Sequence, residues 1–329
     1  MPSRARPGVR ATPAILVWTA ILILYVVWGS TYLAIRVVVE SIPPFVAAAV
    51  RFGIAGAVML VAVAAIRRGE LTWPTRREWR DTFIIGTLLM GGGMGLVAWG
   101  ELTIPSGIAG ILIAMMPVWV AVFGRGFLGE RLPPLAIVGI AAGMTGVVVL
   151  VGSGVGFDRT LDPAGIVALI LSPMAWAAGS LFSAHRARLP RDPFLTTGME
   201  MISGSLVLGL VAIVSGELAT FRLEAATLSS GVALLYLTVV GSLVAFTAFA
   251  WVLRKAPLPL IATYAFVNPV IAVFLGWLIL HEAVTPIQYV AGAVIVVGVA
   301  LLILSRGRME APRRVSRTLD DPEEPAAAA

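Results

Sequence analysis

The chain has 329 residues, of which 59% are hydrophobic and 13% charged, whereas soluble domains carry about 25% charged residues. With a mean hydropathy of +0.95, this composition places the chain among membrane proteins. The absence of cysteine excludes disulfides and thiolate metal sites, and the 24 Lys and Arg residues are scattered between apolar segments, which argues against nucleic-acid binding.

Ten apolar segments are long enough to cross a hydrocarbon core about 30 Å thick, which needs about 20 helical residues. In chain order they lie near Ala14–Ile35, Phe45–Ile66, Thr82–Trp99, Ser106–Phe123, Pro134–Val151, Pro163–Ser183, Phe194–Ser215, Gly231–Leu253, Leu258–Leu280 and Ile287–Leu304. The third contains Gly91–Gly93, which weakens a helix in water but lets helices approach closely in a bilayer. The sequence therefore predicts an all-α membrane protein with ten transmembrane helices.

The second half of the chain repeats the first. Val97–Leu150 aligns without a gap to Phe249–Leu302, 152 residues later, and 14 of the 54 positions are identical. The first helices agree more weakly, because Gly29–Ser30 recurs as Gly179–Ser180. Each copy contains five spans, and an odd number turns the second copy upside down in the membrane. We therefore expect two inverted five-helix repeats.

The repeats and the charges define the expected organisation. It consists of a cytoplasmic tail (1–13), a first repeat (14–151), a glycine-rich linker (152–162), a second repeat (163–304) and a disordered cytoplasmic tail (305–329). Twenty of the 24 basic residues fall on the side of the two tails. Because positive charge stays on the cytoplasmic side, both termini are predicted to be cytoplasmic in a multi-pass plasma-membrane protein.

A set of short motifs carries a family resemblance. The motifs are Trp28–Tyr32, Arg36, Glu40–Ser41, Pro43–Pro44, Arg51–Phe52, Pro105–Ala109, Pro117, Glu130, Tyr264, Asn268–Pro269, Gly276 and Glu282. From Leu24 to Leu304 the chain resembles the EamA branch of the drug/metabolite transporter superfamily, and within it a group of bacterial inner-membrane exporters. The resemblance implies ten helices in two inverted EamA repeats and passage of a small metabolite through a central cavity. It implies no catalytic chemistry and no particular substrate.

Two mid-span prolines mark the expected cavity. Pro117 and Pro269 occupy equivalent positions, and each removes a backbone donor and frees a carbonyl group. Such breaks are tolerated where a cavity or a neighbouring helix satisfies the freed group, and their recurrence points to the binding site of an inverted-repeat transporter. We expect the cavity at the membrane midplane, between spans 1, 3, 4, 6, 8 and 9.

The predicted cavity wall is aromatic and mostly uncharged. Its residues are Trp28, Ser30, Tyr32, Trp99, Met115, Met116, Pro117, Trp119, Trp176, Ser180, Tyr264, Asn268 and Pro269. The alternative for the aromatic residues is anchoring at the membrane interface, and for Tyr32 and Tyr264 both interpretations stay open.

Two ionisable residues lie within spans, where charge is costly. Arg51 could anchor an anion or carboxylate, or it could be a structural arginine that bonds helix-end carbonyl groups or extends to the interface; its modest depth favours the structural interpretation. Glu200 could couple transport to protons, or bond the arginines of the loop between spans 6 and 7. Inverted symmetry places the two on opposite sides of the membrane, which argues against a salt bridge between them.

Three further glutamates lie at span ends. Glu130 and Glu282 recur just before Pro134 and Pro286. A carboxylate there favours the N-terminus of the following helix, so we predict a structural role. Glu101 ends the third span at the outer face, where it could act in gating; a solvated span end is the favoured interpretation.

The sequence therefore predicts a secondary-active exporter of small metabolites (amino acids or related compounds, or amphipathic drugs) that works by alternating access. We expect no catalytic residue, no metal site, no cofactor and no nucleic-acid partner; the absence of a P-loop excludes ATP as the direct energy source. The expected partners are a small-molecule substrate, the lipid bilayer and protons as the coupling ion, with the chain a monomer or a homodimer. The alternatives are a facilitator or lipid-linked substrate flippase on the same fold, or a non-transporting membrane scaffold.

Overall fold

The computed structural model describes residues 14–67, 72–129, 131–152, 162–252, 255–256, 258–261, 263–283 and 285–310. Within these ranges the secondary structure is entirely helical, which confirms the all-α prediction. The predicted N-terminal tail, nearly all of the predicted linker and residues 311–329 of the predicted C-terminal tail lie outside the described residues. The last helix continues to Glu310, beyond the predicted end of the tenth span.

Eight described helices are long and apolar enough to cross a membrane, and two shorter apolar helices complete the predicted ten. Span 1 is built from α1 (Ala14–Ile23), η1 (Leu24–Trp28) and α2 (Gly29–Val38); span 2 is α3 (Pro44–Ile66); span 3 is α4 (Arg76–Gly86), η2 (Thr87–Met94) and α5 (Gly95–Gly100); span 4 is α6 (Ser106–Ile113) and α7 (Met116–Leu128); span 5 is α8 (Pro134–Gly152). Span 6 is α9 (Pro163–His185); span 7 is α10 (Pro193–Val214); span 8 is α12 (Leu228–Tyr236), η4 (Leu237–Val244) and α13 (Ala245–Val252); span 9 is α14 (Leu258–Ile261) and α15 (Tyr264–Leu280); span 10 is α16 (Pro286–Glu310). Two short elements, α11 (Glu217–Thr220) and η3 (Leu223–Ala225), connect spans 7 and 8.

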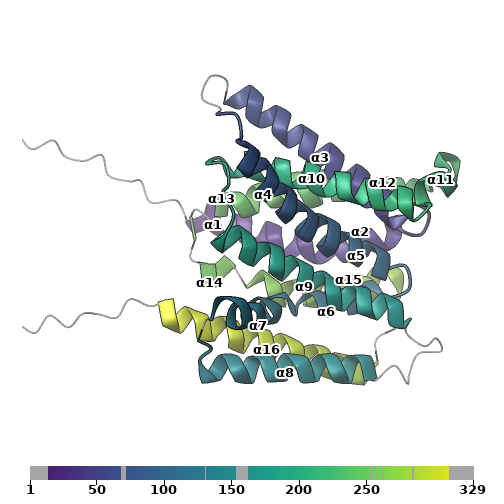
Figure 1. Cartoon of the computed structure of the whole chain (residues 1–329). Helices are drawn as coiled ribbons and strands as arrows, with labels where there is room; N and C mark the ends of the chain where they lie inside the picture. The colour runs from purple at the N-terminus through teal and green to yellow at the C-terminus, as the bar shows by residue number, and fades with distance from the viewer. Residues whose placement is uncertain are drawn as a thin grey trace, which may run out of the picture.

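Two pairs of repeat-equivalent helices form opposite edges of the molecule. α8 packs along α16 at the bottom of Figure 1, and α3 packs along α10 near the top. A Cβ atom on Gly139 would lie 2.6 Å from the carbonyl oxygen of Gly298, so the first pair can approach this closely only with glycine there. In the second pair the Ser205 hydroxyl donates to the carbonyl oxygen of Ala49 at 2.7 Å. The other six spans lie between these pairs.

The six central spans carry π segments, breaks or an internal proline at related places. The π-helical segments η2 and η4 each have eight residues and begin 150 residues apart, at Thr87 and Leu237. Span 1 carries the π-helical η1, while span 6 keeps Pro173 inside α9. Span 4 is broken between α6 and α7, and span 9 between α14 and α15. Because π segments and helix breaks collect at functional sites, the distortions direct attention to the centre of the molecule.

The duplication also extends to a left-handed residue at the end of spans 4 and 9. Gly129 has φ 68° and His281 has φ 53°, and these residues are 152 positions apart. Each donates its N–H to the carbonyl oxygen five residues earlier, on Gly124 and Gly276 respectively. The two helices therefore end by the same motif although one ends on glycine and the other on histidine.

Candidate functional site

A cavity of about 90 Å³ lies where the central spans meet. Its wall draws residues from spans 1, 3, 4, 6, 8 and 9, which are the six spans named from the sequence, and adds Arg51 from span 2. Seven of the predicted wall residues lie on it: Trp28, Tyr32, Met116, Trp176, Tyr264, Asn268 and Pro269. Their role in binding stays a prediction.

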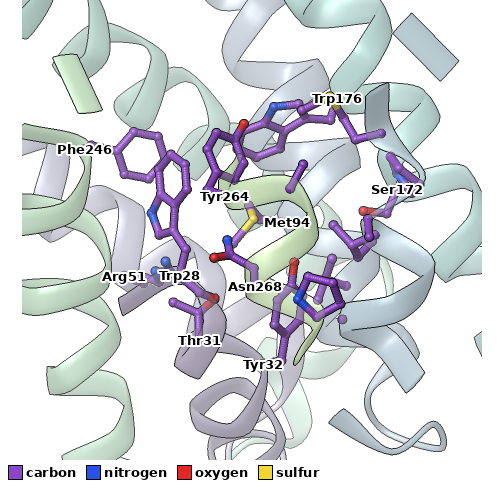
Figure 2. Close-up of a pocket in the computed structure, with 18 residues that line it drawn as sticks. Trp28, Thr31, Tyr32, Arg51, Met94, Ser172, Trp176, Phe246, Tyr264 and Asn268 are labelled. Atoms are coloured by element: carbon purple, nitrogen blue, oxygen red, sulfur yellow. The ribbon is translucent and has the colours of Figure 1, made fainter. Parts of the chain in front are cut away.

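One side of the cavity is aromatic. The Trp28 ring centroid lies 5.5 Å from that of Phe246, 5.2 Å from that of Phe249 and 5.0 Å from that of Tyr264, so a single indole contacts rings from spans 8 and 9. The contacts with Phe246 and Tyr264 are edge-to-face, the geometry that aromatic pairs prefer. Figure 2 shows Trp28 and Phe246 on one side of the cavity and Ser172 on the other.

Polar groups beside the cavity connect span 1 to the break in span 9. In the amide orientation that its neighbours require, the Asn268 side-chain nitrogen donates to the carbonyl oxygens of Tyr25 and Tyr264, each at 3.2 Å. The Tyr25 hydroxyl also hydrogen-bonds the hydroxyl of Thr263. Tyr25 lies in η1 and Thr263 directly precedes α15. Side chains thus link the interrupted backbones of spans 1 and 9.

Arg51 is the one charged residue among those that line the cavity. Its side chain is buried, with 3% of the residue exposed. The Nε donates to the Ser242 hydroxyl at 2.9 Å, and the guanidinium carbon lies 4.8 Å from the ring centroid of Phe52. The buried Nη2 has no acceptor. No helix-end carbonyl oxygen in the described residues accepts a hydrogen bond from Arg51, so the carbonyl contacts expected of a structural arginine are not found; its contacts are with the Ser242 hydroxyl and the Phe52 ring.

Six predicted wall residues lie elsewhere. Ser30 donates to the carbonyl oxygen of Val27 at 2.9 Å and hydrogen-bonds the Tyr236 hydroxyl at 2.6 Å. Met115 and Trp119 line a separate apolar groove of about 450 Å³ that also includes residues of α8 and α9. Trp99, Pro117 and Ser180 are half-buried and do not line the cavity.

The sequence missed several residues that do line it, among them Thr31, Met94, Ser172 and Phe246. Met94 ends η2, and the Ser172 hydroxyl donates to the carbonyl oxygen of Gly93 in the same π segment at 2.8 Å. A π segment rotates the residues that follow it around the helix axis, so counting at 3.6 residues per turn assigns them to the wrong face. The run Gly91–Gly93 was the sequence signal that could have indicated the irregular helix in span 3.

Glu200 is half-buried on α10 and is not on the cavity wall. The structure records no hydrogen bond or ion pair for its carboxylate within the described residues. The loop between spans 6 and 7 is held by Asp81 instead, which accepts the backbone N–H of Arg188 at 2.8 Å and pairs with Arg80 at 2.7 Å. Proton coupling through Glu200 therefore stays a prediction.

Glu282 links the end of span 9 to the start of span 4. Its carboxylate accepts the N–H groups of Ser106 at 2.8 Å and Gly107 at 3.1 Å, and it also bonds the Ser106 hydroxyl at 3.1 Å. The predicted structural role at a helix N-terminus is confirmed, but the predicted helix is wrong: Glu282 caps α6 and not α16, the helix that follows it. Just inside this end, a Cβ atom on Gly110 would lie 2.6 Å from that of Ala272. Spans 4 and 9 are therefore in close contact here. Glu130, the repeat equivalent of Glu282, lies outside the described residues.

Glu101 lies at the same end and is fully buried, so its prediction as a solvated residue is wrong. Both carboxyl oxygens lack a hydrogen-bond partner. Burial and the Glu282 carboxylate raise the pKa of Glu101 well above its usual value, against the opposing effect of Arg36. The Arg36 guanidinium instead donates to the carbonyl oxygens of Glu101 at 2.5 Å and Leu102 at 2.9 Å.

Comparison with known proteins follows the repeat boundaries. The model of the EamA-like transporter family matches residues 16–152 and 163–304. The chain is 34% identical over 303 residues to the uncharacterized inner membrane transporter YedA of Escherichia coli K12, covering 92% of this chain and 95% of that protein. It is 26% identical to the uncharacterized transporter YoaV of Bacillus subtilis over 85% of this chain and 94% of that one. A crystal structure 24% identical in sequence shares the fold with a TM-score of 0.61, over 90% of this chain and 98% of that chain.

Proposed function

The chain belongs to the EamA-like transporter family, and we propose that it is a secondary-active exporter of small metabolites in the bacterial inner membrane. The observation that carries the proposal is the central cavity, which is surrounded by six spans drawn from both repeats, five of them interrupted and the sixth carrying an internal proline. A site at the interface of inverted repeats, beside discontinuous helices, is the arrangement that supports alternating access.

Alternating access requires one end of the cavity to be closed at a time. Spans 4 and 9 are in close contact at the end where Glu282 caps α6. With both termini cytoplasmic, as the charge distribution predicts, this end faces away from the cytoplasm. We propose that the described conformation is closed on that side, and that the equivalent contact between spans 4 and 9 forms at the cytoplasmic end in the opposite state.

The test is transport by the purified protein in proteoliposomes, with candidate substrates taken from the metabolite profiles of cells that lack or overexpress it. An exporter accumulates substrate against its gradient when an ion gradient is imposed. Equilibration without accumulation would identify a facilitator. If neither the metabolite profile nor toxin resistance changes with expression, the transport proposal is wrong and the scaffold alternative holds.

Proton coupling through Glu200 gives a specific prediction. Glu200→Gln removes the titratable group at nearly constant size, and should abolish the dependence of the transport rate on the pH gradient. Glu224→Gln, at an exposed position of η3, is the matched control and should keep it. The measurement is initial uptake into proteoliposomes at several imposed pH gradients. An unchanged dependence in Glu200→Gln would remove this residue from the coupling mechanism.

A further inference from the structure

The residues that line the cavity include one positively charged side chain and no negatively charged one. Arg51 contributes a guanidinium to the wall, and no acidic residue lines the cavity. The Arg51 environment contains a hydroxyl and an aromatic ring, but no carboxylate is recorded within ion-pair distance of it in the described residues. A buried charge without a partner is costly, so this site has a positive charge that an incoming anion would neutralise.

Arg36 is an arginine of the same chain that lies away from the cavity and has hydrogen-bond acceptors for its guanidinium. Its Nη1 donates to two carbonyl oxygens, of Glu101 and Leu102, and Arg36 is not on the cavity wall. Arg51 differs on both counts, because its Nη2 is buried without an acceptor and its side chain lines the cavity. The Nε–Ser242 hydrogen bond fixes one edge of the guanidinium. The unpaired nitrogen is therefore held in place rather than left to rotate.

The remainder of the wall selects against other charge types. A substrate ammonium group would lose its hydration without meeting a carboxylate there and would face the positive charge of Arg51, so ring faces alone would have to offset the desolvation cost. Trp28, Phe246 and Tyr264 offer edges and faces of rings, which bind a flat apolar body well. Asn268 already donates to two carbonyl oxygens. The wall thus suits a molecule with one negative group and an aromatic or apolar body.

We propose that the substrate is a small organic monoanion, a carboxylate with an aromatic or apolar body, and that Arg51 binds the carboxylate. This inference rests on the proposed transport function and narrows it. Within the proposed range of small metabolites, it favours acids without an amino group over zwitterionic amino acids and over cationic amphipathic drugs. Arg51 acts as a substrate-binding residue in this scheme, and the aromatic side of the cavity positions the body of the molecule.

The test uses four probes that share one body and differ in charge: phenylacetate, phenylacetamide, phenethylamine and phenylalanine. Binding to the purified full-length protein in lipid nanodiscs is measured by calorimetry. Phenylacetate should bind at least about tenfold more tightly than each of the others, a difference of about 1.4 kcal/mol. Equal binding of the amide and the carboxylate, or tighter binding of the amine, would overturn the proposal, as would failure of all four to bind.

Three variants separate binding from structure. Arg51→Gln should weaken phenylacetate binding at least about tenfold, and Arg51→Lys should fall between it and the unmodified protein, because lysine keeps the charge but not the planar fork. Arg36→Gln is the matched control and should leave the Kd unchanged. If Arg51→Gln binds phenylacetate as tightly as the unmodified protein does, Arg51 is not the anchor. Uphill efflux of a cation or neutral compound would refute this inference and leave the transport proposal standing.

A second measurement distinguishes an anchor from a structural arginine. In the absence of ligand, Arg51→Met should raise the midpoint of thermal unfolding, because it replaces an uncompensated buried charge by an apolar side chain of similar length. An arginine needed for packing predicts the reverse. A lowered midpoint, together with unchanged phenylacetate binding, would assign Arg51 to structure.

Discussion

Among the described residues, charged side chains that are buried or half-buried differ in whether they find partners. Glu282, Asp81 and Arg36 each find several hydrogen-bond partners and join separate helices or loops. Arg51 and Glu101 keep buried polar atoms without a partner. The first group matches the cost of burying charge, since each member is satisfied. The second group requires another explanation, and for Arg51 we have proposed a ligand.

For Glu101 the consequence is a pH dependence of stability. Its pKa in the folded protein is raised above the unfolded value, so the folded state binds a proton more tightly than the unfolded state does. The contribution of Glu101 to stability is therefore fully present at acidic pH and is lost as the pH rises through the folded pKa. Glu101→Gln should remove this fall and raise the unfolding midpoint at alkaline pH. The measurement is thermal unfolding in detergent across pH, with Glu224→Gln as control; a parallel fall in Glu101→Gln would contradict the assignment.

At the scale of elements, the central helices are discontinuous while the edge helices are whole. α8, α10 and α16 run without interruption, whereas the central spans contain π segments, internal prolines or breaks. The same eight-residue π segment occurs in spans 3 and 8 with different residues in the two copies. The two repeats therefore share the π-helical shape of this segment although most of its residues differ.

The contact between α6 and α15 can be tested with two glycines of the same span. Gly110→Ala places a methyl group 2.6 Å from the Ala272 Cβ, and such overpacking destabilises by about 1–3 kcal/mol. A Cβ atom on Gly126 meets nothing within 4 Å, so Gly126→Ala should be neutral or stabilising by up to about 1 kcal/mol. Chemical unfolding of both variants in detergent measures the difference. Equal stability of the two would show that α6 and α15 are not in close contact.

At the scale of the molecule, two helix pairs enclose six central spans, and each pair joins equivalent helices of the two repeats (Figure 1). This arrangement places every interrupted span next to the cavity and leaves the uninterrupted pairs as rigid edges. A substrate bound at the centre therefore contacts both repeats at once, which is what rocking of one repeat against the other requires.

The predicted orientation is testable because the chain has no cysteine. Lys255 in the loop between spans 8 and 9 and Thr220 in the loop between spans 7 and 8 are both exposed. With the termini cytoplasmic, Thr220→Cys should react with a membrane-impermeant maleimide in intact spheroplasts, and Lys255→Cys only after the membrane is opened. The unmodified protein should not react. The reversed pattern would invert the predicted orientation.

Much of the fold follows from the sequence because a bilayer limits the possibilities. A polar backbone in lipid must close its hydrogen bonds within each helix, so apolar length is enough to identify the ten spans. The inverted orientation of the two halves follows from the odd number of spans in each copy. Trp28 was among the residues predicted to line the cavity, and Tyr264 was left open between the cavity and the membrane interface; both line the cavity. Met115 and Trp119 were assigned with them, but they point into another groove.

What only the tertiary structure decided is the direction of side chains and the identity of their partners. The π segments turn later residues around the helix axis, which brought Met94 to the cavity. Glu282 caps a helix 176 residues earlier in the chain, and Arg51 lies beside Ser242 from span 8. Because span length and repeat symmetry depend on local composition, the sequence by itself determined both. Partner choice depends on how helices pack across the bundle, so the folded chain alone shows that Arg51 lines the cavity and has a buried nitrogen without an acceptor.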